Sequence, residues 1–589
     1  MKSINKIAVI ILVGTLTIMC NKELDQPPVG LVDESKMANK KGVEGLLIGA
    51  YSLLDGAGIN GIDPAPWGSA GSNWVYGSIC GSEGYKGSEF KNDDQAQIIQ
   101  IERFETTAQN PDMDRKWSAV YAGVQRANTV LRVMKKATDI GEQDQRRIAA
   151  EARFLRGFYH LEAAKIWNKV PYVDESVTYE SNNFHLPNDT IWGAIESDFR
   201  FAMNNLPQVM NEPGRVNNYA AMAFLAKALL FQQRNNRDKL SQAKVLLDSL
   251  INYGVTAIGD RYGLLPHYSD NFNIEKKNSY ESVFAAQASV NDGGLGLNGN
   301  QGDILNFPYG GGPAGCCGFF QPSQYLVNHF KTDPLTGLPD LENFNVSDVK
   351  NDEGRASTDT FTIYPGTLDP RIDWTVGRRG IPFLDWGDHP GKDWIRQQQD
   401  YGPYGPIKNT YYKSQQDQYT QQLSWTYGST ANNINLLRFA DVLLWAAEVE
   451  IEIGDLSKAM DYINRVRSRA ADRTGWVSKS TGPYAPYAAN YKIGLYSSEN
   501  FTRENALKIV RYERLLELGM EGHRFFDLVR WGIAETEINS YLKTEMKKRK
   551  HLKDASFNAF NEYFPIPQKQ IDLSAGTDGI SMMKQNPGY

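Results

Sequence analysis

Apolar side chains recur every three or four residues in two long blocks of the chain, which is the spacing of one face of an α-helix. The first block contains five such series, over residues 117–131, 154–161, 191–199, 220–231 and 243–250. Prolines stand between several of them, at Pro171, Pro187, Pro207 and Pro213. Because proline lacks an amide hydrogen and clashes with the preceding turn, we predict a run of separate helices joined by short links.

The second block predicts helices over Leu436–Ile453, Leu456–Arg469, Arg503–Leu518 and around Phe525–Trp531. Gly454 is typical of the end of a helix, and Asp455 is typical of the cap that begins the next one. Paired helices of about 15–20 residues with short links resemble tetratricopeptide hairpins. The expected fold is therefore mainly α, a tetratricopeptide-like helical-repeat scaffold.

The helical pattern is lost between the two blocks. Residues 291–318 are dense in glycine, and residues 360–430 are rich in Trp, Tyr, Gly, Pro and Gln. A stretch this long without clear elements is usually functional in a folded protein. We expect an N-terminal helical region at 20–255, a loop-rich insertion at 256–433 and a C-terminal helical region with a tail at 434–589. Residues 57–92, which are rich in glycine and carry Trp67, Trp74, Tyr76 and Tyr85, are expected to form a smaller companion loop.

The N-terminus predicts export. Two lysines precede an apolar stretch of 13 residues, Ile7 to Met19, which suits a signal-peptide core of about 7–15 residues and is too short for a membrane span. The stretch stops at Cys20, the position at which bacterial lipoproteins are cleaved and acylated. We therefore expect residues 1–19 to be a lipoprotein signal peptide and Cys20 to carry lipid; ordinary secretion with cleavage nearby is the alternative.

Composition narrows the classes of function. The chain has 63 Lys and Arg against 69 Asp and Glu, a net charge of −6, and this acidic balance argues against nucleic-acid binding because that needs a basic face. Downstream of Cys20 only Cys80, Cys316 and Cys317 remain, too few for a disulfide scaffold. A disulfide between the adjacent cysteines, a bridge from Cys80 to one of them, and a free thiol all stay open, and no metal site is expected.

Signatures of catalysis are missing from the sequence. The seven histidines form no His-Glu-x-x-His pair, and neither a Gly-x-Ser-x-Gly elbow nor a phosphate loop occurs. Two Gly-x-Gly-x-x-Gly matches lack the strand and helix that a dinucleotide site needs, so no cofactor is expected. The loops also carry four carboxylates, Asp369, Asp373, Asp385 and Asp388. A pair of them could act as the acid and base of a glycosidase, but turn formation or ligand binding is the commoner role of loop carboxylates.

Several motifs together resemble the SusD/RagB family of outer-membrane lipoproteins. The start after Cys20 is acidic and then carries Pro27-Pro28. The helical motifs are EARFLRGFY at 151–159, LRFADVLL at 437–444, RYER at 511–514, EGHR at 521–524 and DLVRW at 527–531. The chain closes with FPIP at 564–567 and QNPGY at 585–589, as family members do. These landmarks span almost the whole chain.

The resemblance implies a cell-surface lipoprotein of the outer membrane that is not an enzyme. Such proteins sit on a SusC-like TonB-dependent transporter and deliver captured oligo- or polysaccharide to it. The charged motif residues have a structural interpretation, because paired charges on apolar helix faces cross-link helix layers. We expect this role for Arg153, Glu448, Glu513, Arg514, Glu521, Arg524 and Asp527.

A sugar-binding site needs rings to cover the apolar C–H faces and polar groups to satisfy the hydroxyls. In the resembled family the ligand contacts come from the loop after the first helix and from the central insertion. The expected stacking rings are Trp67, Trp74, Trp386 and Trp394, with Tyr309, Phe319 and Phe320 next. The expected polar partners are Asn73, Arg378, Asp385 and Asp388.

Three other functions remain open. A RagB-like receptor would capture peptide in an extended cleft, whereas clustered exposed rings favour glycan. A surface glycosidase would release products from a polysaccharide. A plain helical scaffold would not need so many loop aromatics.

Overall fold

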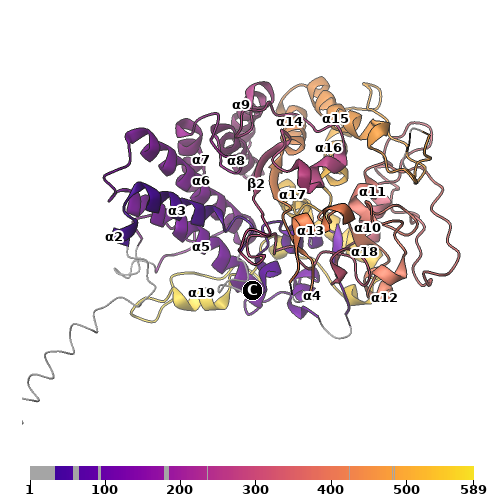
Figure 1. The fold of residues 1–589 in the computed structure, drawn as a ribbon, viewed down its shortest axis with the longest axis horizontal. Helices are drawn as coiled ribbons and strands as arrows, with labels where there is room; N and C mark the ends of the chain where they lie inside the picture. The colour runs from indigo at the N-terminus through magenta and orange to yellow at the C-terminus, as the bar shows by residue number, and fades with distance from the viewer. Residues whose placement is uncertain are drawn as a thin grey trace, which may run out of the picture.

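The structure is a computed structural model and describes residues 34–56, 65–90, 94–177, 185–234, 236–423, 425–480, 482 and 484–589. Its main body is a stack of antiparallel helices, each packed on its neighbours along the chain (Figure 1). The stack consists of α3 (Lys40–Tyr51), α5 (Pro111–Met134), α6 (Glu142–Trp167), α7 (Trp192–Asn205), α8 (Asn218–Phe231), α9 (Asp238–Tyr253), α14 (Phe439–Ile453) and α15 (Leu456–Ala471). The mainly helical fold predicted from the spacing is confirmed.

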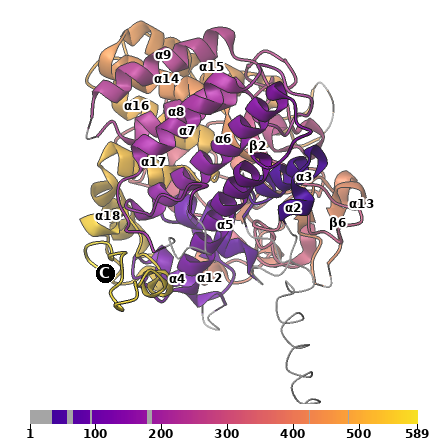
Figure 2. The same cartoon turned by 90° about the vertical axis from the view of Figure 1, so that its left-hand side faces the viewer.

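The two helical blocks of the sequence form one continuous stack. Helix α9 closes the first block and packs directly against α14, which opens the second, and both lie with α15 at one end of the molecule (Figure 2). The remaining longer helices are α16 (Ala506–Leu518), α17 (Arg524–Trp531) and α18 (Ala534–Glu545). Short helices are α2 (Glu34–Met37), α4 (Ala96–Glu102), α10 (Gln324–His329), α11 (Ile372–Thr375), α12 (Gln398–Tyr401), α13 (Gln416–Tyr419) and α19 (Gln568–Leu573).

Local sequence signals explain where several helices begin. The Asn110 side chain accepts a hydrogen bond from the amide of Asp112 at 3.0 Å, and Pro111 occupies the first helical position of α5. The Asp455 side chain accepts from the Ser457 amide at 2.8 Å at the start of α15. These caps satisfy amides that have no partner inside the helix, so the predicted stop and cap between α14 and α15 is confirmed.

Antiparallel strand pairs tie the loops to the helical body. Strand β2 (Ser282–Ala286) pairs with β8 (Ile434–Arg438), which joins the two ends of the insertion next to α14. The helix predicted from Leu436 therefore begins only at Phe439, because the preceding residues belong to the ladder with β2. The other pairs are β1 (Gly84–Gly87) with β3 (Phe319–Pro322), β4 (Val376–Gly377) with β5 (Gly405–Pro406), and β6 (Thr420–Gln421) with β7 (Ser429–Thr430).

Buried ion pairs fasten the insertion to α16. Arg371 of the insertion donates to Glu513 at 2.7 Å, and Lys408 donates to Glu521 at 2.7 Å, just beyond the end of that helix. Burial opposes ionisation of Glu521, but Arg438 and Lys408 outweigh this effect and lower its pKa to about 2. The loops of the insertion are thus held on a charged core.

The charged motif residues cross-link helices as predicted. Ion pairs connect α6 to α7, α14 to α17, and α16 to α17, through Arg153–Asp198, Glu448–Arg530 and Arg514–Asp527. Arg524 differs from the others, because its closest carboxylate, Glu537, lies 3.8 Å away. In the parts of the chain that the structure describes, no helix has an apolar stretch long enough to cross a bilayer.

Candidate functional site

A glycine-rich loop at residues 310–318, which we call the glycine loop, forms the centre of the candidate site. The amide of Ala314 donates to the Tyr411 hydroxyl at 2.9 Å, and its carbonyl accepts from the Thr426 hydroxyl at 3.1 Å and the Tyr427 amide at 3.3 Å. Three segments of the insertion therefore meet at one residue. No atom of the described residues lies within 4 Å of the place where a Cβ of Gly311 would stand, so the backbone is open to a ligand there.

Four rings belong to the segments that meet at the glycine loop, and we call Tyr309, Trp386, Trp425 and Tyr427 the aromatic rim. Trp386 and Tyr427 pack against the cluster that contains Ala314. Tyr309 lies beside Gly318, and Trp425 precedes Thr426, which bonds to Ala314. Trp425 is 45% exposed and Tyr309 is 37% exposed, while the other two are half-buried. The Trp386 indole donates to the Tyr411 carbonyl at 3.0 Å, which anchors the ring on the cluster beneath Ala314. Partly exposed rings held by hydrogen bonds are suited to cover an apolar ligand face.

The adjacent cysteines of the glycine loop, Cys316 and Cys317, form a disulfide with each other. Cys316 is half-buried and Cys317 is buried. Cys80 is a free, buried thiol, and burial raises its pKa well above the usual range. Of the two pairings left open by the sequence, the structure contains the one between neighbours, and Cys80 is the remaining free thiol.

Polar groups flank the rim at Trp386. Asp385 is exposed and accepts hydrogen bonds from the amides of Lys413 and Ser414. The Lys413 ammonium lies 5.8 Å from the centre of the Trp386 ring. Asp388 is also exposed and lies 3.6 Å from the Lys479 ammonium. Both predicted carboxylates are therefore accessible, next to a ring that they could complement.

The structure corrects four of the predicted stacking rings. Trp74, Phe319, Phe320 and Trp394 are all buried, and Trp74 is only 1% exposed. The companion loop and the insertion pair through β1 and β3. The Trp74 and Phe320 rings therefore pack on each other, with their centres 5.5 Å apart. Trp394 packs edge-on against Phe383. A ring without a free face cannot stack on a sugar, because ligand contact needs an accessible surface.

Two predicted polar partners are also used inside the protein. The Asn73 amide donates to Glu162 at 2.8 Å, and its backbone adopts the left-handed conformation before Trp74, which asparagine tolerates. Arg378 forms a two-bond ion pair with Asp373. Both residues are buried, so their hydrogen bonds stabilise the fold and are not available to a ligand.

Trp67 is half-buried, and its indole donates to the Gln95 side chain at 2.9 Å. It therefore stays a predicted contact. Residues 1–19 and Cys20 lie outside the described residues.

Two rim residues were not among the predicted contacts. Trp425 and Tyr427 lie near the end of the insertion, where the sequence shows no special motif. A ring followed by glycine is the signal that could have found Tyr427, which precedes Gly428, just as Trp386 precedes Gly387. The Gly387 backbone is open in the same way as that of Gly311.

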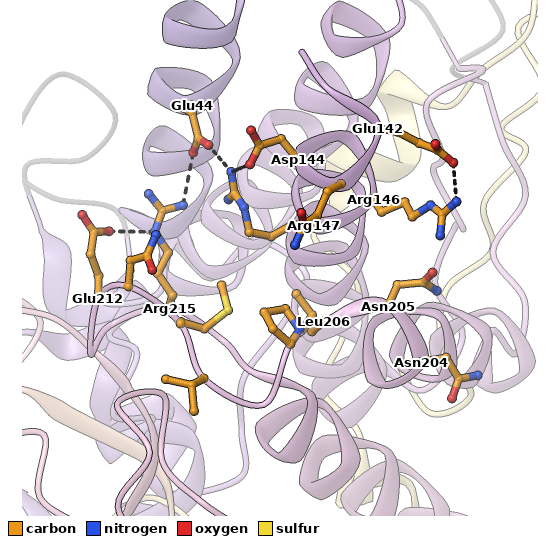
Figure 3. Close-up of a pocket in the computed structure, with 15 residues that line it drawn as sticks. Glu44, Glu142, Asp144, Arg146, Arg147, Asn204, Asn205, Leu206, Glu212 and Arg215 are labelled. Carbon is orange, nitrogen blue, oxygen red and sulfur yellow. Dashed lines mark hydrogen bonds and ion pairs between the residues drawn. The ribbon is translucent and has the colours of Figure 1, made fainter.

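A groove of about 870 Å³ lies on the helical side, between α3, the start of α6 and the turn after α7 (Figure 3). Its charged side chains pair with one another: Arg147 and Arg215 both bind Glu44, and Arg215 also binds Glu212 at 2.8 Å. None of the described residues that line it carries an aromatic ring. The groove is therefore a poor match for a sugar face.

Comparisons with known proteins agree with this fold. Residues 280–589 match the model of the SusD family, and residues 70–230 match a family described as starch-binding and associating with the outer membrane. SusD-like protein P25 of Formosa agariphila is 22% identical over 585 residues, which cover 94% of each chain.

Solved structures of similar shape include a laminarin-binding SusD-like protein. It is 21% identical, with a TM-score of 0.63, over 94% of this chain and all of that one. Surface glycan-binding protein A of Bacteroides thetaiotaomicron, solved in complex with laminarihexaose, is 19% identical with a TM-score of 0.58, over 93% of this chain and 99% of that one. Because the family model matches more than half of its residues, the chain belongs to the SusD family.

Proposed function

We propose that this protein captures oligo- or polysaccharide at the aromatic rim, on the cell surface, and delivers it to a SusC-like TonB-dependent transporter. SusD family proteins are non-catalytic glycan-binding proteins, so binding without cleavage is the expected activity. The observation that carries the proposal is the open backbone of the glycine loop, flanked by rings with free surface and by the carboxylates of Asp385 and Asp388.

The chemistry of the rim matches a neutral sugar. A pyranose offers C–H faces that Trp386 and Trp425 could cover, and hydroxyls that carboxylates could accept from. Because Asp385 is already held by two backbone amides, its oxygens are positioned before a ligand arrives. Such pre-organisation lowers the entropy cost of binding.

Laminarin oligosaccharides are the first ligands to test, because one protein of similar shape is named for binding laminarin and another was solved in complex with laminarihexaose. The full chain in detergent is titrated with laminarihexaose by calorimetry, with starch and xylan oligosaccharides alongside. The proposal expects binding of at least one glycan and no release of shorter products. If no glycan of a broad panel binds, glycan capture at the rim is refuted; release of shorter products would favour the glycosidase alternative.

Peptide capture is the second candidate function within the same family. The open backbone of the glycine loop favours it, because extended peptides bind through backbone hydrogen bonds. A mixture of peptides added to the same protein distinguishes the two. Peptide binding that is lost in Trp386→Ala, together with no glycan binding, would reassign the rim to peptides.

Lipid anchoring and transporter binding have their own tests. Cys20→Ala removes the sulfur that would be acylated, so the protein should leave the membrane fraction, because acyl chains supply about 0.8 kcal/mol for each buried methylene. Protease treatment of intact cells should degrade the wild-type protein if it faces outward. Co-purification of a TonB-dependent transporter with the wild-type protein from solubilised outer membranes tests the partner.

A further inference from the structure

A second cavity, of about 610 Å³, lies between α10, the loop at 341–346, and helices α16, α17 and α18. Its volume is within the range of about 300–1,000 Å³ that is usual for small-ligand sites. No residue of the aromatic rim lines it. The cavity is therefore separate from the glycan site proposed above.

Two arginines of this cavity have unused hydrogen-bond donors. Arg524 is only 9% exposed, and its Nε has no partner among the residues that the structure describes. Its Nη2 is 3.8 Å from Glu537, too far for a hydrogen bond. The buried Nε of Arg511 is also unpaired, and no carboxylate in the described part of the chain lies within ion-pair distance of it. Burial lowers the pKa of Arg511. A buried hydrogen-bond donor without a partner destabilises the folded protein. A bound anion would accept hydrogen bonds from both arginines.

Other charges at the cavity leave it with a positive excess. Lys508, which is half-buried, pairs with the exposed Glu342. Glu537 is the remaining carboxylate in the lining of the cavity, and it balances the charge of only one of the two arginines. His329 is neutral, because burial lowers its pKa well below the usual value, and its Nδ1 bonds to the Tyr325 carbonyl. Outside the cavity, Glu448 and Glu452 attract Arg511, and Arg530 repels it. Glu83 attracts Arg524. Among the described residues that line the cavity, Glu537 is therefore the one acid without a lysine partner.

The walls of the cavity supply apolar surface and fix the arginines. The Arg511 guanidinium lies 5.2 Å from the centre of the Trp531 ring, which holds it by a cation–π contact. Phe344 and Leu341 form a half-buried apolar wall on the other side. A ligand that fits has an anionic group at one end and a compact apolar face at the other.

We propose that this cavity is a second binding site, for a small ring-shaped molecule that bears an oxyanion, a carboxylate or a sulfate, held by Arg511 and Arg524. Arginine binds both groups by paired, charge-assisted hydrogen bonds. Acidic or sulfated monosaccharides have this chemistry. The site goes beyond glycan capture at the rim and does not depend on it.

The test is calorimetric titration of the full chain with glucuronate, glucose 6-sulfate and neutral glucose. At least one of the two anionic sugars binds and glucose does not, and comparison of the two identifies carboxylate or sulfate as the preferred group. Arg511→Gln weakens binding by roughly tenfold or more, since a hydrogen bond to a charged group is worth about 1.5–3 kcal/mol. Lys543→Gln, an exposed change of the same charge on α18 outside the cavity, leaves affinity unaltered. Equal binding of glucose, or equal affinity in Arg511→Gln, overturns the proposal.

Chemical labelling tests the site in the unmodified protein. Phenylglyoxal reacts with free guanidinium groups, and peptide mass spectrometry locates the adducts. Glucuronate or glucose 6-sulfate should slow labelling of Arg511 several-fold, while labelling of the exposed Arg465 on α15 continues at the same rate. Absence of selective protection at saturating anionic sugar overturns the assignment even if the substituted protein fails to fold.

Discussion

Replacing Trp425 by alanine tests the aromatic rim with little effect on the fold, because 45% of this residue is exposed. A tryptophan side chain presents up to about 250 Å², so its exposed part is roughly 110 Å². A sugar ring that covers one face would bury about half of that, roughly 55 Å². At ~25 cal/mol per Å² the lost contact is worth about 1.4 kcal/mol, which corresponds to about tenfold weaker binding.

The assay is calorimetric titration of the full chain with the tightest glycan found for the wild-type protein. Tyr253→Ala is the matched control, since this ring is 67% exposed at the end of α9, on the helical stack. Thermal unfolding of both variants should match the wild type. Unaltered affinity in Trp425→Ala, or the same loss in both variants, would show that the rim does not contact the glycan.

The remaining predictions concern the rim, the core and pH. Trp386→Ala should weaken glycan binding about tenfold or more with a modest loss of stability, whereas Trp74→Ala should cost about 3–5 kcal/mol of folding free energy and lower Tm strongly. Thermal unfolding and calorimetry on the same samples separate the effect on stability from the effect on binding. Equal stability of the two variants would contradict the burial of Trp74. Glu521 has a folded-state pKa of about 2 against an ordinary 4.5, so its stabilisation is complete above pH ~4.5 and is lost as pH falls toward 2, about 3 kcal/mol in all. Urea unfolding at pH 7, 4 and 3 should show this dependence in the wild type and a weaker one in Glu521→Gln. At pH 7 the variant should be about 3–5 kcal/mol less stable than the wild type, because Arg438 and Lys408 stay buried without the Glu521 carboxylate. Identical pH profiles of the two proteins would refute the lowered pKa of Glu521.

The helical stack could be predicted because its causes are local. An apolar residue at every third or fourth position makes a stripe that must be buried, whatever covers it. Caps such as Asp455 and the prolines between helices act within a few residues. The predicted start of α14 is wrong because residues 434–438 are apolar enough for either a helix or a strand, and only pairing with the distant strand β2 makes them a strand.

Which loop rings face solvent could not be predicted. Trp74 and Trp425 have similar surroundings in the sequence, yet one is buried and the other is open. The difference arises because β1 and β3, more than 200 residues apart, pair and enclose the Trp74 ring. In the same way, Asn73 and Arg378 resemble ligand-binding residues until their buried partners Glu162 and Asp373 are known.

The sequence by itself determined the helical frame, the class of the protein and the regions from which a ligand site could come, since periodicity, caps and family motifs are properties of short segments. The tertiary structure alone decided which side chains form that site and which stabilise the interior. Accessible surface depends on contacts between segments far apart in the chain, and no local pattern encodes them.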